Sequence, residues 1–197
     1  MTGKITKIQR QILLLMVFSH KESIIDLDVI KLNVPIDIRT LQRDIKELTE
    51  AGFLKVSYDR RENRYLGSVF VPKTIDAKDE KKQRYFERIR HYEKMIFSMY
   101  ECITIDLVED IISELDIYEY MHRDWEKTGR FFYEPEYRGP DLDRELSADE
   151  VYFKLFPKAK DSDFMKDICF LKEIGFPIDY CEKLDVYYTD FPDALEA

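Results

Sequence analysis

The stretch "DIRTLQRDIKELTEAGF", Asp37 to Phe53, has the pattern of one amphipathic helix with a defined beginning and a defined end. Asp37 stands where a carboxylate accepts hydrogen bonds from the free amide groups of a first helical turn. Gly52 stands where a residue with left-handed backbone commonly follows a last turn. We therefore expect a helix from about Ile38 to Ala51. The residues expected to form its buried apolar face are Ile38, Leu41, Ile45 and Leu48.

A second face of the same helix is basic. Its side chains recur at intervals of three and four residues, which places them together on one side of a helix. Such a face suits DNA, because glutamine pairs with adenine, arginine pairs with guanine, and further cations neutralise phosphates. The alternative is a solvated helix face without a ligand, which is the ordinary meaning of exposed charges. The candidate residues on this face are Arg39, Gln42, Arg43 and Lys46.

The segments around this helix complete a small domain. Directly after it, "FLKVSYDRRENRYLGSVFV" alternates apolar and polar residues on both sides of "DRREN", which is typical of a β-hairpin. Before it come an apolar-periodic helix at 8–19 and a shorter helical segment at 25–32, which ends because Pro35 disfavours helical backbone at Val34. Three helices and a hairpin make a winged helix-turn-helix, which we place in residues 1–75. The hairpin tip carries Arg60, Arg61 and Arg64.

The run "IRTLQRDIKELTEAGFLKVSYDRRENRYLG" resembles the DeoR-type winged helix, especially that of the WYL-domain transcription regulators, whose third helix commonly reads R-T-[IL]-x-R-D-[IL]-x-x-L. The resemblance covers about residues 5–67. It implies DNA binding, with the hairpin wing on the neighbouring backbone. This chain has Asp37 where the family prefers Ser, and it has no recognisable WYL domain downstream. On the helix, the resemblance places Arg39, Thr40, Gln42 and Arg43 at the major groove or the phosphates.

Part of this domain recurs later in the chain. A shift of 123 residues aligns 24–65 with 147–188 without a gap, so we expect a second, degenerate winged-helix-like unit within 76–197. The run "FLKEIGFPIDY" resembles the same family. The first helix of this copy is expected to be "RYFERIRHYEKMIFSMYECI", because "MIFSMYECI" at 95–103 parallels "MVFSHKESI" at 16–24. The paired positions include Leu48 with Leu171, Gly52 with Gly175, Phe53 with Phe176 and Tyr65 with Tyr188.

The second copy has not kept the basic face. Losing several cations removes most of the counterion release that supplies non-specific affinity for DNA, so we expect no DNA binding from this copy. A protein partner suits its helix face better. The alternative is that Phe164, Met165 and Phe170 are core residues. In the order of the first copy, the residues at the basic positions are Ser162, Met165, Lys166 and Cys169.

An insert, 104–146, separates the first and second helices of this copy. Its apolar spacing predicts one helix up to about Met121. From Arg123 we expect an aromatic-rich loop that either binds a partner or packs on its own domain. The preceding helix, about 78–100, is expected to join the two units or to pair with a second subunit. A homodimer is expected because such readers usually bind two half-sites.

Composition limits the class of protein. Residues 1–75 hold 13 Lys and Arg against 9 Asp and Glu, although the whole chain has a net charge of -9, so total charge does not decide whether a polyanion binds. No apolar run is long enough to cross a membrane and no small-residue cleavage site follows the first apolar patch, so we expect a cytoplasmic protein without membrane contact. Three cysteines without a C-x-x-C pair disfavour a disulfide framework and a zinc site.

Motifs for catalysis are missing from the sequence. No H-x-x-x-H, H-E-x-x-H or phosphate-cradling glycine loop occurs, and His20, His91 and His122 are scattered. No nucleophile stands beside a recognisable base. The acidic run "VEDIISELD" is more typical of a solvated helix face than of a two-metal site. We expect no enzyme activity, no cofactor and no bound metal.

The sequence therefore favours a mainly α fold with small β-hairpins, an α+β chain of two winged helix-turn-helix units with a domain boundary after residue 75. The favoured function is that of a sequence-specific transcription regulator, expected to be a repressor, which binds double-stranded DNA through its N-terminal domain. The acidic half would serve self-association or partner binding. Two alternatives stay open: a tandem winged-helix adaptor that binds only proteins, and an acidic DNA mimic that inhibits a nucleic-acid enzyme.

Overall fold

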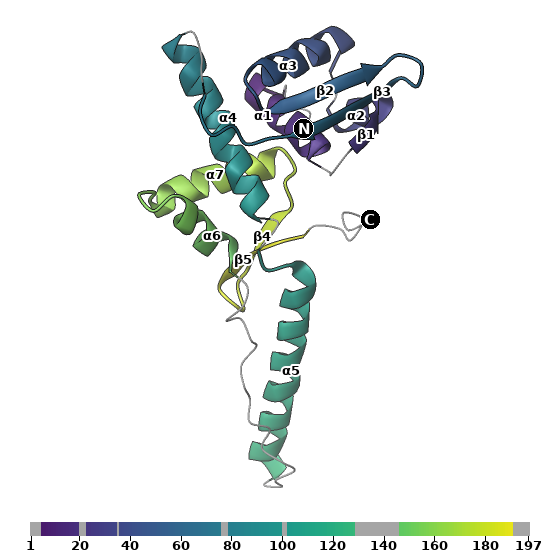
Figure 1. Cartoon of the computed structure of the whole chain (residues 1–197). Helices are drawn as coiled ribbons and strands as arrows, with labels where there is room; N and C mark the ends of the chain where they lie inside the picture. Colours follow the sequence, from purple (N-terminus) through teal and green to yellow (C-terminus); the bar gives the residue numbers. More distant parts are fainter. Residues whose placement is uncertain are drawn as a thin grey trace. The chain divides into compact units, whose positions relative to one another are not determined.

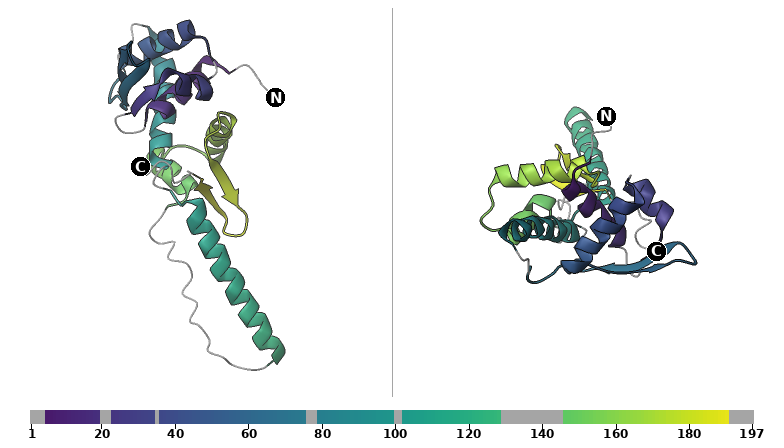
Figure 2. Two further views of the ribbon diagram at one scale, coloured as in Figure 1. Left: turned by 90° about the vertical axis from the view of Figure 1, so that its right-hand side faces the viewer. Right: turned by 90° about the horizontal axis from the view of Figure 1, so that it is seen from above.

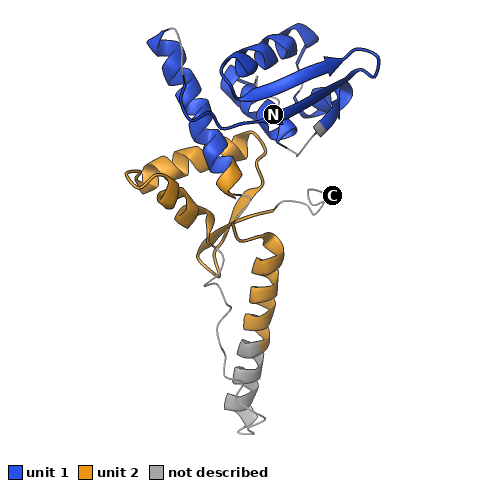
Figure 3. Cartoon of the chain, viewed as in Figure 1, with its two compact units in different colours: residues 1–96 blue, residues 97–197 orange. Residues whose placement is uncertain are grey.

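The computed structural model describes residues 5–19, 23–34, 36–75, 79–99, 102–128 and 146–190 (Figure 1). Helices dominate, and the strands form two small antiparallel sheets, which confirms the α+β class. The chain divides into two compact units, residues 1–96 and 97–197 (Figure 3). The division falls within helix α4, Glu80–Met99, whereas the sequence placed the boundary after residue 75.

Unit 1 contains three helices, a three-stranded sheet and most of α4. The strand order is β1-β3-β2, and both pairings are antiparallel. The sequence assigned Ile25 to a helix, and this assignment was wrong. Ile25 is buried in a strand, where it pairs with Tyr65 of the hairpin. The elements are α1 Lys7–Phe18, β1 Ser23–Asp26, α2 Leu27–Asn33, α3 Ile38–Glu50, β2 Leu54–Asp59 and β3 Arg64–Val69.

Helix α3 begins and ends as its sequence predicts. The carboxylate of Asp37 accepts a hydrogen bond from the amide of Thr40 at 2.9 Å, which confirms the N-cap. At the other end, Gly52 has a left-handed backbone with φ 82°. The amide of Phe53 then donates to the carbonyl of Leu48 at 2.9 Å and satisfies one of the last free carbonyls. These local signals fix the helix at both ends.

One predicted core residue of α3 is not in the core. Leu41, Ile45 and Leu48 are buried, but Ile38 is 45% exposed. Ile38 is the first residue of the helix, and the Cα–Cβ bonds of a helix tilt toward its amino end. A side chain at the first position therefore points past the end of the packed face, which is why helical spacing alone misplaced it.

Gly67 in β3 lies close to the neighbouring strand β2 and to α1. A Cβ atom at this position would lie 2.7 Å from Cγ2 of Val56 on β2 and 3.4 Å from Cδ1 of Phe18 on α1. We expect Gly67→Ala to lower the free energy of unfolding by about 1–3 kcal/mol, because an added carbon in a filled space forces neighbours to shift. Urea denaturation of the full chain measures this, with Ser68→Ala as the control on the same strand. Equal midpoints for the two variants would contradict the expectation.

Unit 2 contains two shorter helices, a hairpin and the long helix α5, Ile105–Thr128. Helix α5 is longer than predicted, and the loop expected from Arg123 was wrong as far as Thr128. Residues 123–128 contain no proline or glycine that would stop a helix. The rest of that predicted aromatic loop, and the side chains of 118–145, lie outside the described residues. The other elements are α6 Ala148–Leu155, α7 Asp161–Glu173, β4 Ile178–Cys181 and β5 Val186–Thr189.

The helix and hairpin of unit 2 repeat those of unit 1. Helices α3 and α7 each have 13 residues and each precede a left-handed glycine, Gly52 with φ 82° and Gly175 with φ 84°. As in unit 1, the amide after this glycine returns to the helix: Phe176 donates to the carbonyl of Leu171 at 3.0 Å. The correspondence predicted for this segment is therefore present in the backbone.

The two hairpins match in detail, at an offset of 122 residues. Tyr58 and Tyr65 pair across the first hairpin with ring centroids 4.7 Å apart, and Tyr180 and Tyr187 pair across the second at 4.9 Å. The ungapped alignment, which matched Tyr65 with Tyr188, was wrong at this point. Unit 2 has one residue fewer between the glycine and the hairpin. A shift of one residue moves a side chain to the other face of a sheet, so the offset decides which tyrosine is equivalent.

The first helix of the repeat is also displaced from its expected register. The sequence matched Phe18 with Phe97, but Phe97 is 38% exposed whereas Phe18 is fully buried. The burial pattern of α1 recurs on α4 at an offset of 81 residues instead. At that offset, Glu93 takes the place of the buried Ile12. The remaining matches are Leu14 with Met95, Leu15 with Ile96 and Phe18 with Met99, all buried.

Glu93 is a buried carboxyl group in an apolar position. It is 2% exposed, and neither carboxylate oxygen has a hydrogen-bond partner among the described residues. Burial raises the pKa of Glu93 to about 9, because an apolar environment disfavours the charged form. Between its ordinary pKa of 4.5 and this value, the folded chain holds a proton that the unfolded chain releases. The stability of the fold should therefore fall as pH rises through this window.

We expect Glu93→Gln to remove most of this pH dependence and to raise the free energy of unfolding at pH 8 by roughly 2–3 kcal/mol. The amide keeps the shape of the protonated acid and has no proton to lose. Urea denaturation at several pH values between 5 and 9 measures the effect. The control is Glu80→Gln, because Glu80 lies exposed on the same helix. Parallel pH profiles for wild type and Glu93→Gln would refute the expectation.

Candidate nucleic-acid interface

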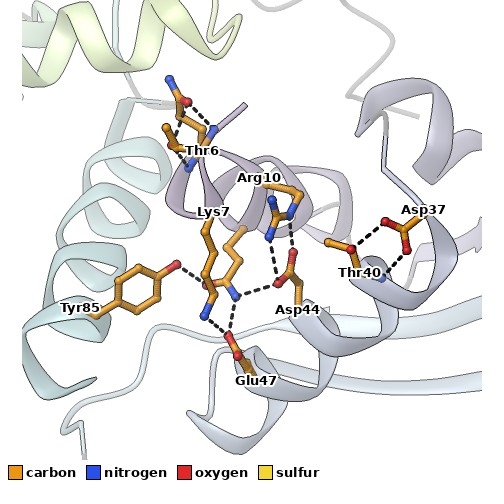
Figure 4. A network of polar contacts seen from close by, with 10 residues as sticks. Thr6, Lys7, Arg10, Asp37, Thr40, Asp44, Glu47 and Tyr85 are labelled. Atoms are coloured by element: carbon orange, nitrogen blue, oxygen red, sulfur yellow. Dashed lines mark hydrogen bonds and ion pairs between the residues drawn. The ribbon is translucent and has the colours of Figure 1, made fainter. Parts of the chain in front are cut away.

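Helix α3 is held on α1 by a buried ion pair (Figure 4). The carboxylate of Asp44 is fully buried, and it accepts hydrogen bonds from Nε and, at 3.3 Å, from a terminal nitrogen of Arg10. The amide of Gln11, also fully buried, donates to the same carboxylate at 3.4 Å. A buried charge needs such partners, because removing it from water without them costs several kcal/mol. The pair therefore fixes the rotation of α3 about its own axis.

The same network extends along α3 to α4. Gln11 donates a second hydrogen bond to Glu47 at 3.0 Å, and Lys7 makes an ion pair with Glu47 at 2.5 Å. The hydroxyl of Tyr85, on α4, donates to the side-chain carbonyl of Gln11 at 2.8 Å. Burial alone would raise the pKa of Glu47, but the hydrogen bonds from Lys7 and Gln11 outweigh it and hold the pKa below its usual range. Burial raises the pKa of Tyr85, so this hydroxyl keeps its proton and remains a donor.

The outward side of α3 carries the predicted cations. Arg39, Gln42, Arg43 and Lys46 are all exposed, and we call these four residues the α3 basic face. Lys46 lies 3.8 Å from Glu50 in an exposed ion pair one turn away, which costs little to break. No ion pair to Arg39 or Arg43 occurs among the described acidic side chains. Two guanidinium groups are thus available to a ligand on a helix that is fixed from behind.

Thr40 lies at the amino end of α3, but its polar groups are already engaged. Its hydroxyl donates to Asp37 at 2.8 Å, in addition to the bond from its amide. These two bonds, first from the amide and then from the hydroxyl, hold the pKa of Asp37 below its usual range. Thr40 therefore serves the helix cap, and the Asp37 carboxylate is turned onto its own helix.

The tip of the β2–β3 hairpin presents two further cations. The amides of Arg61 and Glu62 donate to the carboxylate of Asp59 at 2.8 and 3.3 Å, and the hydroxyl of Tyr58 donates to Asn63 at 2.7 Å. These bonds order the turn, and Asn63 adopts its left-handed backbone with φ 55°. Arg60 and Arg61 are exposed at this tip. Figure 2 shows the hairpin extending past the helices of unit 1.

Arg64 differs from the other two hairpin arginines because acids surround it. It makes an ion pair with Glu62, and the strand register places it between Asp26 and Asp59. The hydrogen bond and charge of Glu62, with the charges of the two aspartates, raise the pKa of Arg64 above its usual range. Its charge is largely compensated within the fold, so Arg64 is the weakest of the predicted candidates for an anionic ligand.

Charge divides between the two units. Unit 1 holds 20 Lys and Arg against 14 Asp and Glu, a net charge of +6. Unit 2 holds 11 against 26, a net charge of -15. Only unit 1 therefore has the sign of charge that attracts a polyanion.

The surface of unit 2 equivalent to the α3 basic face is mostly uncharged. Ser162, Met165, Lys166 and Cys169 are exposed there, as the sequence predicted for a changed face. Of the three residues that the sequence could also assign to the core, Phe164 is a core residue at 4% exposed, whereas Met165 is 45% exposed and is not; Phe170 is half-buried. The sulfur of Met165 lies 3.3 Å from the hydroxyl of Tyr187. The hairpin of unit 2 keeps the turn of unit 1 and carries Glu182, Lys183 and Leu184 at its tip.

Sequence reasoning missed two features of this surface. The buried ion pair of Arg10 and Asp44 cannot be predicted from the spacing of apolar residues. An aspartate beside the apolar positions of α3 did indicate that a buried cation would be needed to pair with it. The second missed feature is the exposure of Ile38.

The described residues contain no group of three or more His, Cys, Asp or Glu side chains suited to a metal ion. Within the same ranges, no helix combines the length and apolar character that crossing a membrane requires.

Comparisons of this chain with protein-family models, with curated proteins and with solved structures found no match.

Proposed function

We propose that unit 1 is a winged helix-turn-helix that binds double-stranded DNA, with α3 as the recognition helix and the β2–β3 hairpin as the wing. The observation that carries the proposal is the α3 basic face. Its two arginines, Arg39 and Arg43, have no ion-pair partner among the described residues. This face lies on the side of the helix away from Asp44, whose buried ion pair fixes the helix. A recognition helix places its amino-terminal residues at base edges in the major groove. Arg39, Gln42 and Arg43 occupy those positions and have the chemistry to pair with guanine, adenine and phosphate.

The hairpin supports the same proposal from a second position. Arg60 and Arg61 stand at an ordered tip that extends past the helices of unit 1 (Figure 2). Cations there would neutralise phosphates beside the groove that α3 occupies, which adds affinity and fixes orientation without reading sequence. Arg64 contributes little, because its charge is compensated by neighbouring acids.

Unit 2, in this proposal, is a second winged-helix-like unit that does not bind DNA. It repeats the helix, the glycine and the hairpin register of unit 1, but it has a net charge of -15 and a helix face with Lys166 as its one charged residue among the four equivalent positions. We assign it to self-association or to a protein partner. A homodimer would place two copies of α3 on two half-sites, as DNA regulators of this kind commonly do. Occupation of a promoter by such a dimer would make the protein a repressor.

Selection from a random duplex library with the full chain tests the proposal. Enrichment of one motif, with affinity that Arg39→Ala and Arg43→Ala abolish, would support a sequence-specific regulator. Binding without enrichment would indicate a protein that contacts only the backbone. Absence of binding at low salt would favour the two alternatives, an adaptor that binds only proteins or an acidic DNA mimic. The exposed Met165 in unit 2 is the observation that favours a protein partner among these alternatives.

A further inference from the structure

Ile38 is a large apolar side chain that stands beside the α3 basic face. It is 45% exposed at the first residue of the helix, next to the exposed Arg39. A single exposed apolar residue has no special meaning on an ordinary surface. Its place at the amino end of the proposed recognition helix is what makes it informative, because that end is the part which meets base edges.

Helix geometry puts Ile38 and Gln42 together. Residues four apart lie one above the other on the same side of a helix. Both side chains are exposed. The Asp37 carboxylate accepts two hydrogen bonds from Thr40. The polar groups of Asp37 and Thr40 are therefore occupied within the helix cap and are less available to hydrogen-bond a base. The end of α3 therefore offers one apolar group, one amide and the guanidinium of Arg39.

These groups match a particular chemistry in the major groove. The C5-methyl group of thymine is the apolar feature that the major groove displays, and apolar side chains contact it. Adenine displays an acceptor and a donor side by side, which an amide side chain pairs with bidentately. Ile38 and Gln42 together are thus suited to thymine and adenine at neighbouring positions, whereas a guanidinium is suited to guanine.

We propose that Ile38 is a specificity-determining residue, which contacts a thymine methyl group while Gln42 pairs with an adjacent adenine. This inference rests on the proposed DNA-binding function. Unit 2 provides a contrast within the same chain. At the positions equivalent to Ile38 and Gln42 it has Asp161 and Met165, an anion and a thioether that do not reproduce this pair.

The test removes the methyl group from the DNA. The full chain is used to select a motif from a random duplex library, and each thymine of that motif is then replaced in turn by deoxyuridine, which lacks only the methyl. For the wild type, we expect one thymine in each half-site at which the replacement lowers affinity about 3- to 10-fold, the worth of one buried methyl-sized group. Ile38→Ala should lose about the same affinity on the original duplex and should no longer respond to deoxyuridine at that position.

Controls separate this inference from the proposed function. Leu32→Ala removes another exposed apolar side chain of unit 1, on α2, and should bind and respond as the wild type does. Ile38 is exposed, so Ile38→Ala should keep the thermal midpoint of the wild type. A selected motif that tolerates deoxyuridine everywhere, or an Ile38→Ala variant that responds like the wild type, would overturn the inference while DNA binding stands. A chain that binds no duplex would overturn both.

Discussion

Replacing Arg39 and Arg43 together by alanine is expected to lower the affinity of the full chain for duplex DNA by at least about 100-fold. Both side chains are exposed on α3, and no described acid makes an ion pair with them. Each lost phosphate contact should also reduce the slope of log K against log salt by about one. Fluorescence polarisation with a labelled duplex at several salt concentrations measures the affinity and the slope together.

The repeat supplies a matched control for this variant. Lys166 occupies on α7 the position that Arg43 occupies on α3, and it is also exposed. Lys166→Ala removes a cation from the same element of the fold, and we expect it to leave DNA affinity within about twofold, because unit 2 repels a polyanion. If Lys166→Ala and the double arginine variant weakened binding equally, affinity would depend on overall charge and not on the α3 basic face.

Asp44→Ala is expected to lower the free energy of unfolding by about 3–5 kcal/mol, the largest stability effect that we expect from a single side chain of unit 1. Asp44 is fully buried, and Arg10 and Gln11 both donate to it. Removing the carboxylate leaves a guanidinium and a buried amide without their acceptor. Urea denaturation followed by circular dichroism measures the loss. The α3 basic face should also lose affinity for DNA, because the pair fixes the rotation of its helix.

Asp167 is the control for Asp44. It occupies the equivalent position on α7, where it is only half-buried and accepts a hydrogen bond from Tyr152 at 2.8 Å. Asp167→Ala should cost about 1–2 kcal/mol, because it leaves the hydroxyl of the buried Tyr152 without this acceptor. A larger loss for Asp167→Ala than for Asp44→Ala would contradict the account of the ion pair.

Local signals in the sequence were sufficient to predict the elements of unit 1 that have caps and stops. Helix α3 was predictable within one residue because Asp37 and Gly52 act on their own neighbours. Strand β1 was not predictable, since Ile25 becomes a strand residue only by pairing with Tyr65, 40 positions away in the chain. Long-range pairing of this kind overrides local periodicity.

The candidate site shows the same division. The exposed cations of α3 followed from helical spacing, because spacing determines which residues share a side. The compensation of Arg64 did not, since it depends on strand register with Asp26 and Asp59. The repeat was visible in the sequence from Leu48 and Gly52. The single-residue offset at the hairpin needed the backbone, which makes Tyr187 and not Tyr188 the residue equivalent to Tyr65.

The central claim is that unit 1 binds DNA through the cations of α3 and the hairpin tip. Its most direct test is the affinity of the full chain for a random-sequence duplex, measured between about 50 and 200 mM salt. Three to five phosphate contacts predict that affinity falls by roughly 40- to 500-fold over this range. Binding that does not respond to salt, or no binding even at about 50 mM, would contradict the claim and leave the α3 basic face a solvated helix surface.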